Sequence, residues 1–132
     1  MGQTYRRTQT TVSLINYHFV FCPRYRRKVL VEDVDIRFRE ILQQACDEHE
    51  IIIVAVEVMP DQVHLFVNAL PFISPSDIMA KIKGVSSRKL RQEFKHLQHL
   101  PSLWTRSFFC SAAGNVSSDT IQRYIAEQKT RG

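Results

Sequence analysis

Two short segments of the sequence carry side chains that could act together on a phosphate group. The first, residues 59–67, is typical of a turn that leads into a β-strand, and it places Gln62 and His64 two residues apart. Because side chains alternate between the faces of a strand, the two share one face and can point at one metal ion. The second is the C-terminal segment that carries Tyr124 and Gln128 four residues apart, hence on one face of a helix.

These residue types suit metal-assisted phosphoryl chemistry. A tyrosine hydroxyl can attack a phosphodiester when a metal ion polarises the phosphate. His64, Gln62 and Gln128 would supply three ligands and leave positions open for phosphate oxygens or water. The residues alone favour a structural interpretation, because a lone histidine on a strand is commonly hydrogen-bonded within the fold and a helical tyrosine commonly packs.

The hydrophobic pattern predicts the elements that must position these residues. Their order is strand, helix, strand, strand, helix, strand, helix, and they span residues 11–22, 31–50, 51–58, 62–70, 75–94, 104–113 and 120–129. This order predicts an α+β fold with a ferredoxin-like, RRM-like antiparallel sheet (βαββαβ) and helices on one face. The extra C-terminal helix can then cross the other face, where Gln62 and His64 lie. We expect a single domain over residues 1–132, with a flexible arm at 1–10, the βαββαβ core at 11–116 and the C-terminal helix at 117–130.

Charge points to a polyanionic partner. The 132 residues have a net charge of +5 and an isoelectric point of about 9.4. The basic residues fall into clusters in the loop after the first strand, along the second helix and at the C-terminus, which favours nucleic acid over a merely solvated surface. No apolar run is long enough to cross a membrane, and the three cysteines fit neither a disulfide framework nor a zinc cluster.

The loop after the first strand combines cations with an aromatic ring, a mixture that suits phosphate contact and base stacking. The predicted DNA-binding residues are Arg24, Tyr25, Arg26, Arg27 and Lys28 in this loop and Lys83, Arg88 and Lys89 on the second helix. Gly84 interrupts that helix at a cost of about 1 kcal/mol relative to alanine.

Several segments together carry a family resemblance. They are residues 17–21 followed by 24–30, then 58–67, 83–90, 103–104 with 106–109, and 121–128, which occur in family order and at family spacing. On these segments the sequence resembles the insertion-sequence-200-like (IS200-like) transposases, which are single-tyrosine members of the HUH endonuclease superfamily.

The resemblance implies a metal-dependent transposase of single-stranded DNA that recognises hairpins at the ends of its element. Tyr124 would attack a DNA phosphate and form a 5′-phosphotyrosine link, while His64 and Gln128 would hold Mg²⁺ or Mn²⁺. The resemblance further implies a homodimer in which the tyrosine helix of one subunit completes the metal site of the other. The protein would act in the cytoplasm on nucleoid DNA.

The sequence departs from the family pattern at one ligand. The family has His–hydrophobic–His on the metal strand, and here the first histidine position is Gln62. An amide oxygen still ligates a hard cation such as Mg²⁺ or Mn²⁺, but it is a weaker ligand for softer metals. This departure keeps open an alternative function as a catalytically impaired or domesticated hairpin-binding protein.

Two further interpretations concern neighbouring residues. His18 on the first strand and Asp61 in the turn before Gln62 are candidates to hold the metal ligands in position without contacting the metal themselves. Tyr17, Phe19 and Phe21 could instead mimic the exposed aromatics of an RNA-binding sheet, but that interpretation leaves the Tyr124 helix unexplained.

Overall fold

The fold is a four-stranded antiparallel sheet with helices on both sides. The computed structural model describes residues 5–8, 11–112 and 118–131. The strands are β3 (Ile15–Phe21), β4 (Ile52–Met59), β5 (Gln62–Ala69) and β6 (Phe109–Ser111), in the order β4-β5-β3-β6. This topology confirms the predicted ferredoxin-like arrangement. The expected boundary between core and C-terminal helix, at 116/117, lies outside the described residues.

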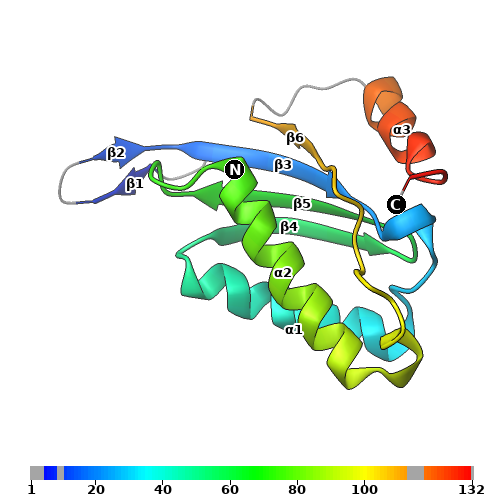
Figure 1. The fold of residues 1–132 in the computed structure, drawn as a ribbon. Coiled ribbons are helices and arrows are strands. Elements are labelled where there is room, and N and C mark those ends of the chain that lie inside the picture. The colour runs from blue at the N-terminus through cyan, green and yellow to red at the C-terminus, as the bar shows by residue number, and fades with distance from the viewer. Residues whose placement is uncertain (1–4, 9–10, 113–117, 132) are drawn as a thin grey trace.

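Two helices cover one face of the sheet and a third lies on the other side (Figure 1). Helices α1 (Glu32–Glu48) and α2 (Pro75–Glu93) form the lower layer, and α3 (Ser118–Glu127) lies above the sheet. In the described residues no helix has the length and apolar character needed to cross a membrane.

The core lies between the sheet and the first two helices. Val63, Leu65 and Val67 of β5 are fully buried, as strand alternation predicts for the face opposite Gln62 and His64. Helix α2 begins as expected, because the Ser74 side chain accepts a hydrogen bond from the Asp77 backbone N–H at 3.1 Å.

The first strand is shorter than predicted. It divides into β2 (Val12–Ser13) and β3, and β2 pairs with β1 (Arg6–Arg7) inside the segment expected to be a flexible arm. The resulting ribbon projects from one end of the sheet (Figure 1). The Arg6 guanidinium fixes this ribbon to the rest of the chain, because the guanidinium donates to the Asn68 Oδ1 and the Glu50 carbonyl, both at 2.8 Å.

The strand expected at 104–113 is also mostly irregular. Trp104 forms only an isolated bridge with Pro23, and β6 starts at Phe109. The physical reason is that α2 supplies other hydrogen-bond partners to this segment. The Lys83 Nζ donates to the carbonyls of Thr105 at 2.9 Å and Ser107 at 2.7 Å, so these groups do not need a strand partner.

The basic loop after β3 contains a short 3₁₀ helix, η1 (Arg24–Arg26), in which Tyr25 and Arg26 have φ angles of 57° and 51°. A second 3₁₀ helix, η2 (Lys95–Leu97), follows α2. η1 connects three parts of the chain, because the Arg24 N–H donates to the Leu103 carbonyl and the Tyr25 N–H to the Arg131 carbonyl, both at 2.9 Å. It therefore holds the end of the C-terminal segment against the sheet.

Candidate active site

The candidate site lies on the face of the sheet opposite α1 and α2. On β5 this face carries Gln62, His64 and Phe66. The strand register places Glu57 and Val20 on either side of His64. The site is therefore built on regular, paired strands, which fix the directions of its side chains.

His64 is supported by a second histidine. The His18 Nε2 lies 3.3 Å from the His64 Nδ1, and the His18 ring stacks on Phe66 with 4.1 Å between ring centroids. Burial lowers the pKa of both histidines, and the nearby His64 lowers that of His18 further. Both rings are thus held in the neutral form that a metal ligand needs. In the described part of the chain the His64 Nε2 has no hydrogen-bond partner, so this nitrogen is the one open to a metal.

Gln62 presents an unsatisfied oxygen. Its Nε2 lies 2.6 Å from the Met59 Sδ, and its Oε1 is buried without a hydrogen-bond partner among the described residues. A buried acceptor of this kind is costly unless something binds it. The amide oxygen and the imidazole are neutral donors of the kind that a hard divalent cation accepts, so the residues present fit Mg²⁺ or Mn²⁺. No group of three His, Cys, Asp or Glu side chains in the described residues could hold a metal alone.

Tyr124 and Gln128 on and after α3 are joined through Ser107. The Ser107 Oγ lies 3.2 Å from the Tyr124 Oη and donates to the Gln128 Oε1 at 3.2 Å. The Gln128 Nε2 donates to the Tyr124 carbonyl at 3.1 Å, and the Gln128 side chain is only 1% exposed. Both ends of this amide are therefore engaged within the chain.

Aromatic rings connect the tyrosine to the histidines. The Tyr124 ring lies 6.3 Å from that of Phe109 on β6, which in turn lies 6.1 Å from that of His18. Tyr124 and His64 therefore lie on the same side of the sheet. Burial raises the pKa of Tyr124, while its hydrogen bond to Ser107 opposes this change. Among the described residues no hydrogen bond links Tyr124 or Gln128 to Gln62 or His64.

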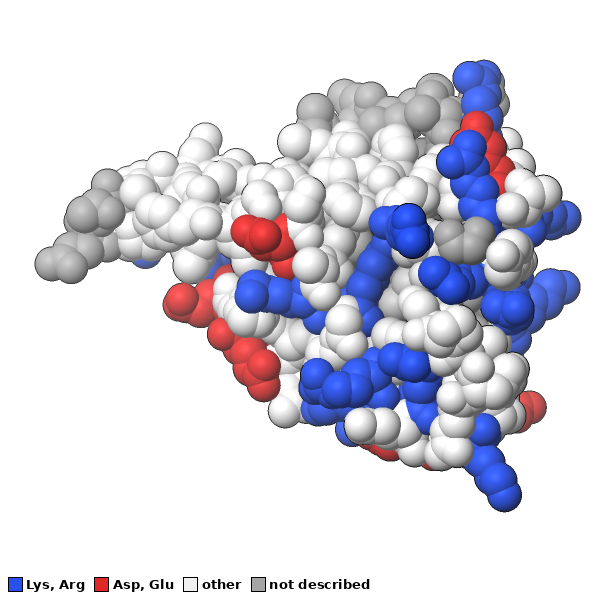
Figure 2. Space-filling model, viewed as in Figure 1, with Lys and Arg blue, Asp and Glu red and all other residues white. Residues whose placement is uncertain are grey.

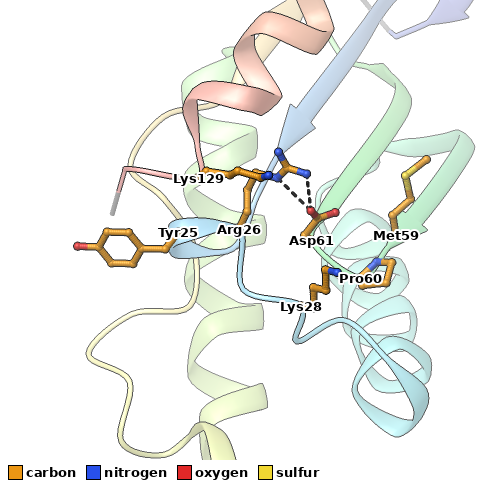
Figure 3. Close-up of a pocket in the computed structure, with 7 residues that line it drawn as sticks. All are labelled: Tyr25, Arg26, Lys28, Met59, Pro60, Asp61 and Lys129. Atoms are coloured by element: carbon orange, nitrogen blue, oxygen red, sulfur yellow. Dashed lines mark hydrogen bonds and ion pairs between the residues drawn. The ribbon is translucent and has the colours of Figure 1, made fainter.

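A pocket of about 660 Å³ lies between η1, the β4–β5 turn and the residues after α3 (Figure 3). Arg26 and Asp61 form an ion pair at 2.6 Å in its wall, and Arg26 also reaches the Ile125 carbonyl of α3 at 3.5 Å. Two of the predicted functional residues are thus paired with each other, and the pair connects the turn before Gln62 to α3. Lys28 and Lys129 also line the pocket, while Tyr25 points away from the ion pair (Figure 3).

The other predicted DNA-binding residues are split between surface and interior. Tyr25 is 51% exposed, and the Arg27 guanidinium lies 5.2 Å from its ring centroid. Arg88 is exposed on α2, whereas the Lys83 ammonium is bound to backbone carbonyls. Figure 2 shows Lys and Arg side chains gathered over α2 and the segments beside it.

Residue-by-residue reasoning overlooked Ser107. A serine in a predicted strand has no feature that marks it, and only its place within residues 106–109, which carry part of the family resemblance, singled out this segment. Its role became visible once the fold brought the segment against α3.

Comparison with known proteins identifies the family of this chain. The family described as "Transposase IS200 like" matches residues 11–128. The ISDra2 transposase TnpA of Deinococcus radiodurans is 30% identical over 117 residues, which are 86% of this chain and 84% of that protein. The transposase for insertion sequence element IS200 of Salmonella typhimurium is 30% identical over 115 residues, which are 85% of this chain and 75% of that protein.

Solved structures extend the likeness to three dimensions. A crystal structure from Deinococcus radiodurans R1, described as that of a candidate transposase, has a TM-score of 0.82 and 32% identity over 93% of this chain and 97% of that one. A REP-associated tyrosine transposase bound to a REP hairpin shares the fold, with a TM-score of 0.60 and 19% identity over 95% of this chain and 68% of that one. From the match over nearly its whole length, the chain belongs to the IS200-like transposase family.

Proposed function

We propose that the chain is a metal-dependent transposase that cleaves and rejoins single-stranded DNA at hairpin-marked ends through a 5′-phosphotyrosine intermediate. The observation that supports the proposal is the series of ring contacts from Tyr124 through Phe109 and His18 to His64. The residue that would attack and the residue that would bind the metal therefore face the same side of the sheet. The hairpin-bound relative and the basic surface over α2 support DNA as the substrate.

Each of the chain's own groups has a separate role in this reaction. Gln62, His64 and Gln128 would hold Mg²⁺ or Mn²⁺, which polarises the scissile phosphate when bound. The Tyr124 Oη attacks phosphorus and forms the phosphotyrosine bond as the bond to the 3′-oxygen breaks. The phenolic proton leaves to solvent, and the departing oxygen takes up a proton to become a 3′-hydroxyl. The covalent link conserves the energy of the broken bond, so the reverse attack by a 3′-hydroxyl rejoins a strand without ATP.

A gel assay with a labelled single-stranded hairpin and Mn²⁺ tests the nucleophile. The unaltered chain should form a covalent protein–DNA adduct, and Tyr124→Phe should form none. Tyr5→Phe is the matched control, because Tyr5 is 60% exposed near the N-terminus and should leave adduct formation unchanged. An adduct with Tyr124→Phe would show that the nucleophile is another residue.

The site is proposed to assemble between the subunits of a homodimer. This proposal rests on the Gln128 amide, whose oxygen and nitrogen are both hydrogen-bonded within the chain, to the Ser107 hydroxyl and the Tyr124 carbonyl. Mixed dimers of Tyr124→Phe and His64→Ala subunits test it, because only a shared site combines an intact tyrosine with an intact histidine. Adduct formation on the His64→Ala subunit is the expected result, and a mixture that stays inactive would place both residues in one subunit's site.

A second candidate function is hairpin binding without cleavage, and the specific observation that favours it is Gln62 in place of a histidine. Calorimetric titration with Mn²⁺ in the presence of the hairpin separates the two functions. Metal binding together with adduct formation supports the transposase, whereas hairpin binding with no metal uptake supports the binding protein.

A further inference from the structure

A second basic pocket, apart from the tyrosine and the metal strand, lies between α2 and the segment that follows η2. It encloses about 310 Å³, and its cations are Arg24, Lys83, Arg91 and Arg106, contributed by η1, α2 and the segment before β6. None of the described residues that line it is Asp or Glu. We call it the Arg24 pocket.

The charges of the Arg24 pocket are not neutralised within the described part of the chain. None of its four cations forms an ion pair there. Lys83 and Arg91 donate to backbone carbonyls, which are neutral, and the Arg24 Nε is buried without a hydrogen-bond partner. Four neighbouring cations without a compensating carboxylate in the described residues favour an anion that supplies acceptor oxygens.

The shape and donor set of the pocket indicate which anion. Guanidinium groups present paired N–H donors that match the oxygens of a phosphate. Gly84 lines the pocket and a Cβ built there would meet nothing within 4 Å, so the wall beside α2 is open. Resting on the proposed function, we propose that the Arg24 pocket binds a backbone phosphate of the DNA strand.

Lys83 connects this pocket to the tyrosine. Its Nζ binds the Ser107 carbonyl at 2.7 Å, and the Ser107 hydroxyl lies 3.2 Å from the Tyr124 Oη. A phosphate bound beside Lys83 therefore rests on the same short segment that holds the nucleophile. This connection favours a phosphate of the single-stranded flank next to the cleavage site over one in the hairpin stem.

The salt dependence of DNA binding by the full chain tests the proposal without requiring cleavage. For single-stranded DNA the slope of log K against log salt concentration is about −0.7 per phosphate neutralised. Arg106→Gln and Arg24→Gln should each weaken binding of a hairpin with a single-stranded flank and reduce the slope by about 0.7. Arg106 is exposed, so its replacement should leave the fold intact. Arg39→Gln on α1 removes the same charge at a residue that does not line the pocket and should keep the slope of the unaltered chain.

Measuring the slope with the flanked hairpin and with the bare hairpin shows which part of the DNA carries the bound phosphate. A reduced slope only with the flanked hairpin places it in the flank, and a reduced slope with both the flanked and the bare hairpin places it in the stem. Trp104, the single tryptophan of the chain, lines the pocket and provides a local probe. Its fluorescence, excited at a wavelength that DNA does not absorb, should change on titration with the flanked hairpin.

An unchanged slope for both variants, while the unaltered chain binds the hairpin, would overturn the pocket assignment and leave the proposed function standing. Failure of the unaltered chain to bind any hairpin would overturn both. Normal binding by the unaltered chain together with absence of its Tyr124 adduct would contradict only the cleavage proposal.

Discussion

The hydroxyl of Ser107 lies 3.2 Å from the phenolic oxygen of Tyr124. The same hydroxyl donates to the Gln128 Oε1 at 3.2 Å, so one serine orients both the proposed nucleophile and the proposed third ligand. Its bond to the tyrosine also opposes the rise that burial causes in the pKa of Tyr124. Ser107 therefore acts as a positioning residue for α3.

Replacing Ser107 should slow cleavage. Ser107→Ala removes a hydrogen bond of about 1 kcal/mol from the tyrosine, and we expect the rate of adduct formation to fall by roughly five- to tenfold. Single-turnover assays at saturating hairpin and Mn²⁺ measure this rate. Ser107→Thr keeps the hydroxyl and should restore most of it. A faster reaction with Ser107→Ala would show that the serine restrains Tyr124 instead of positioning it.

Lys83 should stabilise the segment that carries Ser107. Burial lowers the pKa of Lys83 to about 8, and its ammonium binds the carbonyls of Thr105 and Ser107. Lys83→Met leaves these carbonyls without donors, so the free energy of unfolding measured with urea should fall by about 1–3 kcal/mol. Lys81→Met, on an exposed position of the same helix, is the control and should change it by less than about 0.5 kcal/mol. Equal losses in the two variants would show that the carbonyl bonds contribute no stability.

The regular elements were predictable because their signals are local. Strand alternation placed Val63 and Leu65 in the core and Gln62 and His64 on the opposite face, and a capping serine marked the start of α2. The end of the sheet was not predictable in this way. The segment from Trp104 to Ser107 has the composition of a strand, but Lys83 reaches it from α2 and satisfies its carbonyls. A side chain that competes with strand pairing across more than twenty residues leaves no periodic signal.

The residues of the candidate site could be proposed from the sequence, and their roles stay predictions, whereas their contacts could not be foreseen. Residue type and spacing indicated the histidine, the tyrosine and both glutamines, and the structure places His18 beside His64. The interaction of Asp61 with Arg26 depends on two loops that meet only in the fold, so neither sequence neighbourhood revealed it. The position of Ser107 between Tyr124 and Gln128 is of the same kind.

Acid should destabilise the protein through the paired histidines. Burial lowers the pKa of His18 and His64 below the value of about 6.5 that they have in the unfolded chain. Between the folded and unfolded pKa values the unfolded state binds more protons, so the free energy of unfolding falls as the pH drops through 6.5. Urea unfolding at pH 7.5, 6.5 and 5.5 measures this slope. It should be shallower in His64→Gln, while the exposed-loop control His99→Gln should match the unaltered chain. An equal slope in His64→Gln would assign the acid sensitivity to other groups.

Gln62 is the residue on which the choice between cleavage and binding depends. Its Oε1 is buried without a hydrogen-bond partner among the described residues. Gln62→Leu removes this oxygen, which no described residue binds, so the chain should stay folded. The same change should abolish Mn²⁺ binding, because it removes a proposed ligand. Gln62→His replaces the amide with a stronger ligand and should tighten Mn²⁺ binding, most of all relative to Mg²⁺, because imidazole favours the softer ion. Titration calorimetry with the hairpin present measures both changes. If Gln62→His forms the Tyr124 adduct and the unaltered chain does not, the glutamine has converted a transposase into a hairpin-binding protein. If Gln62→Leu binds Mn²⁺ as well as the unaltered chain, the amide is not a ligand, and the unsatisfied oxygen must have another partner in the assembled protein.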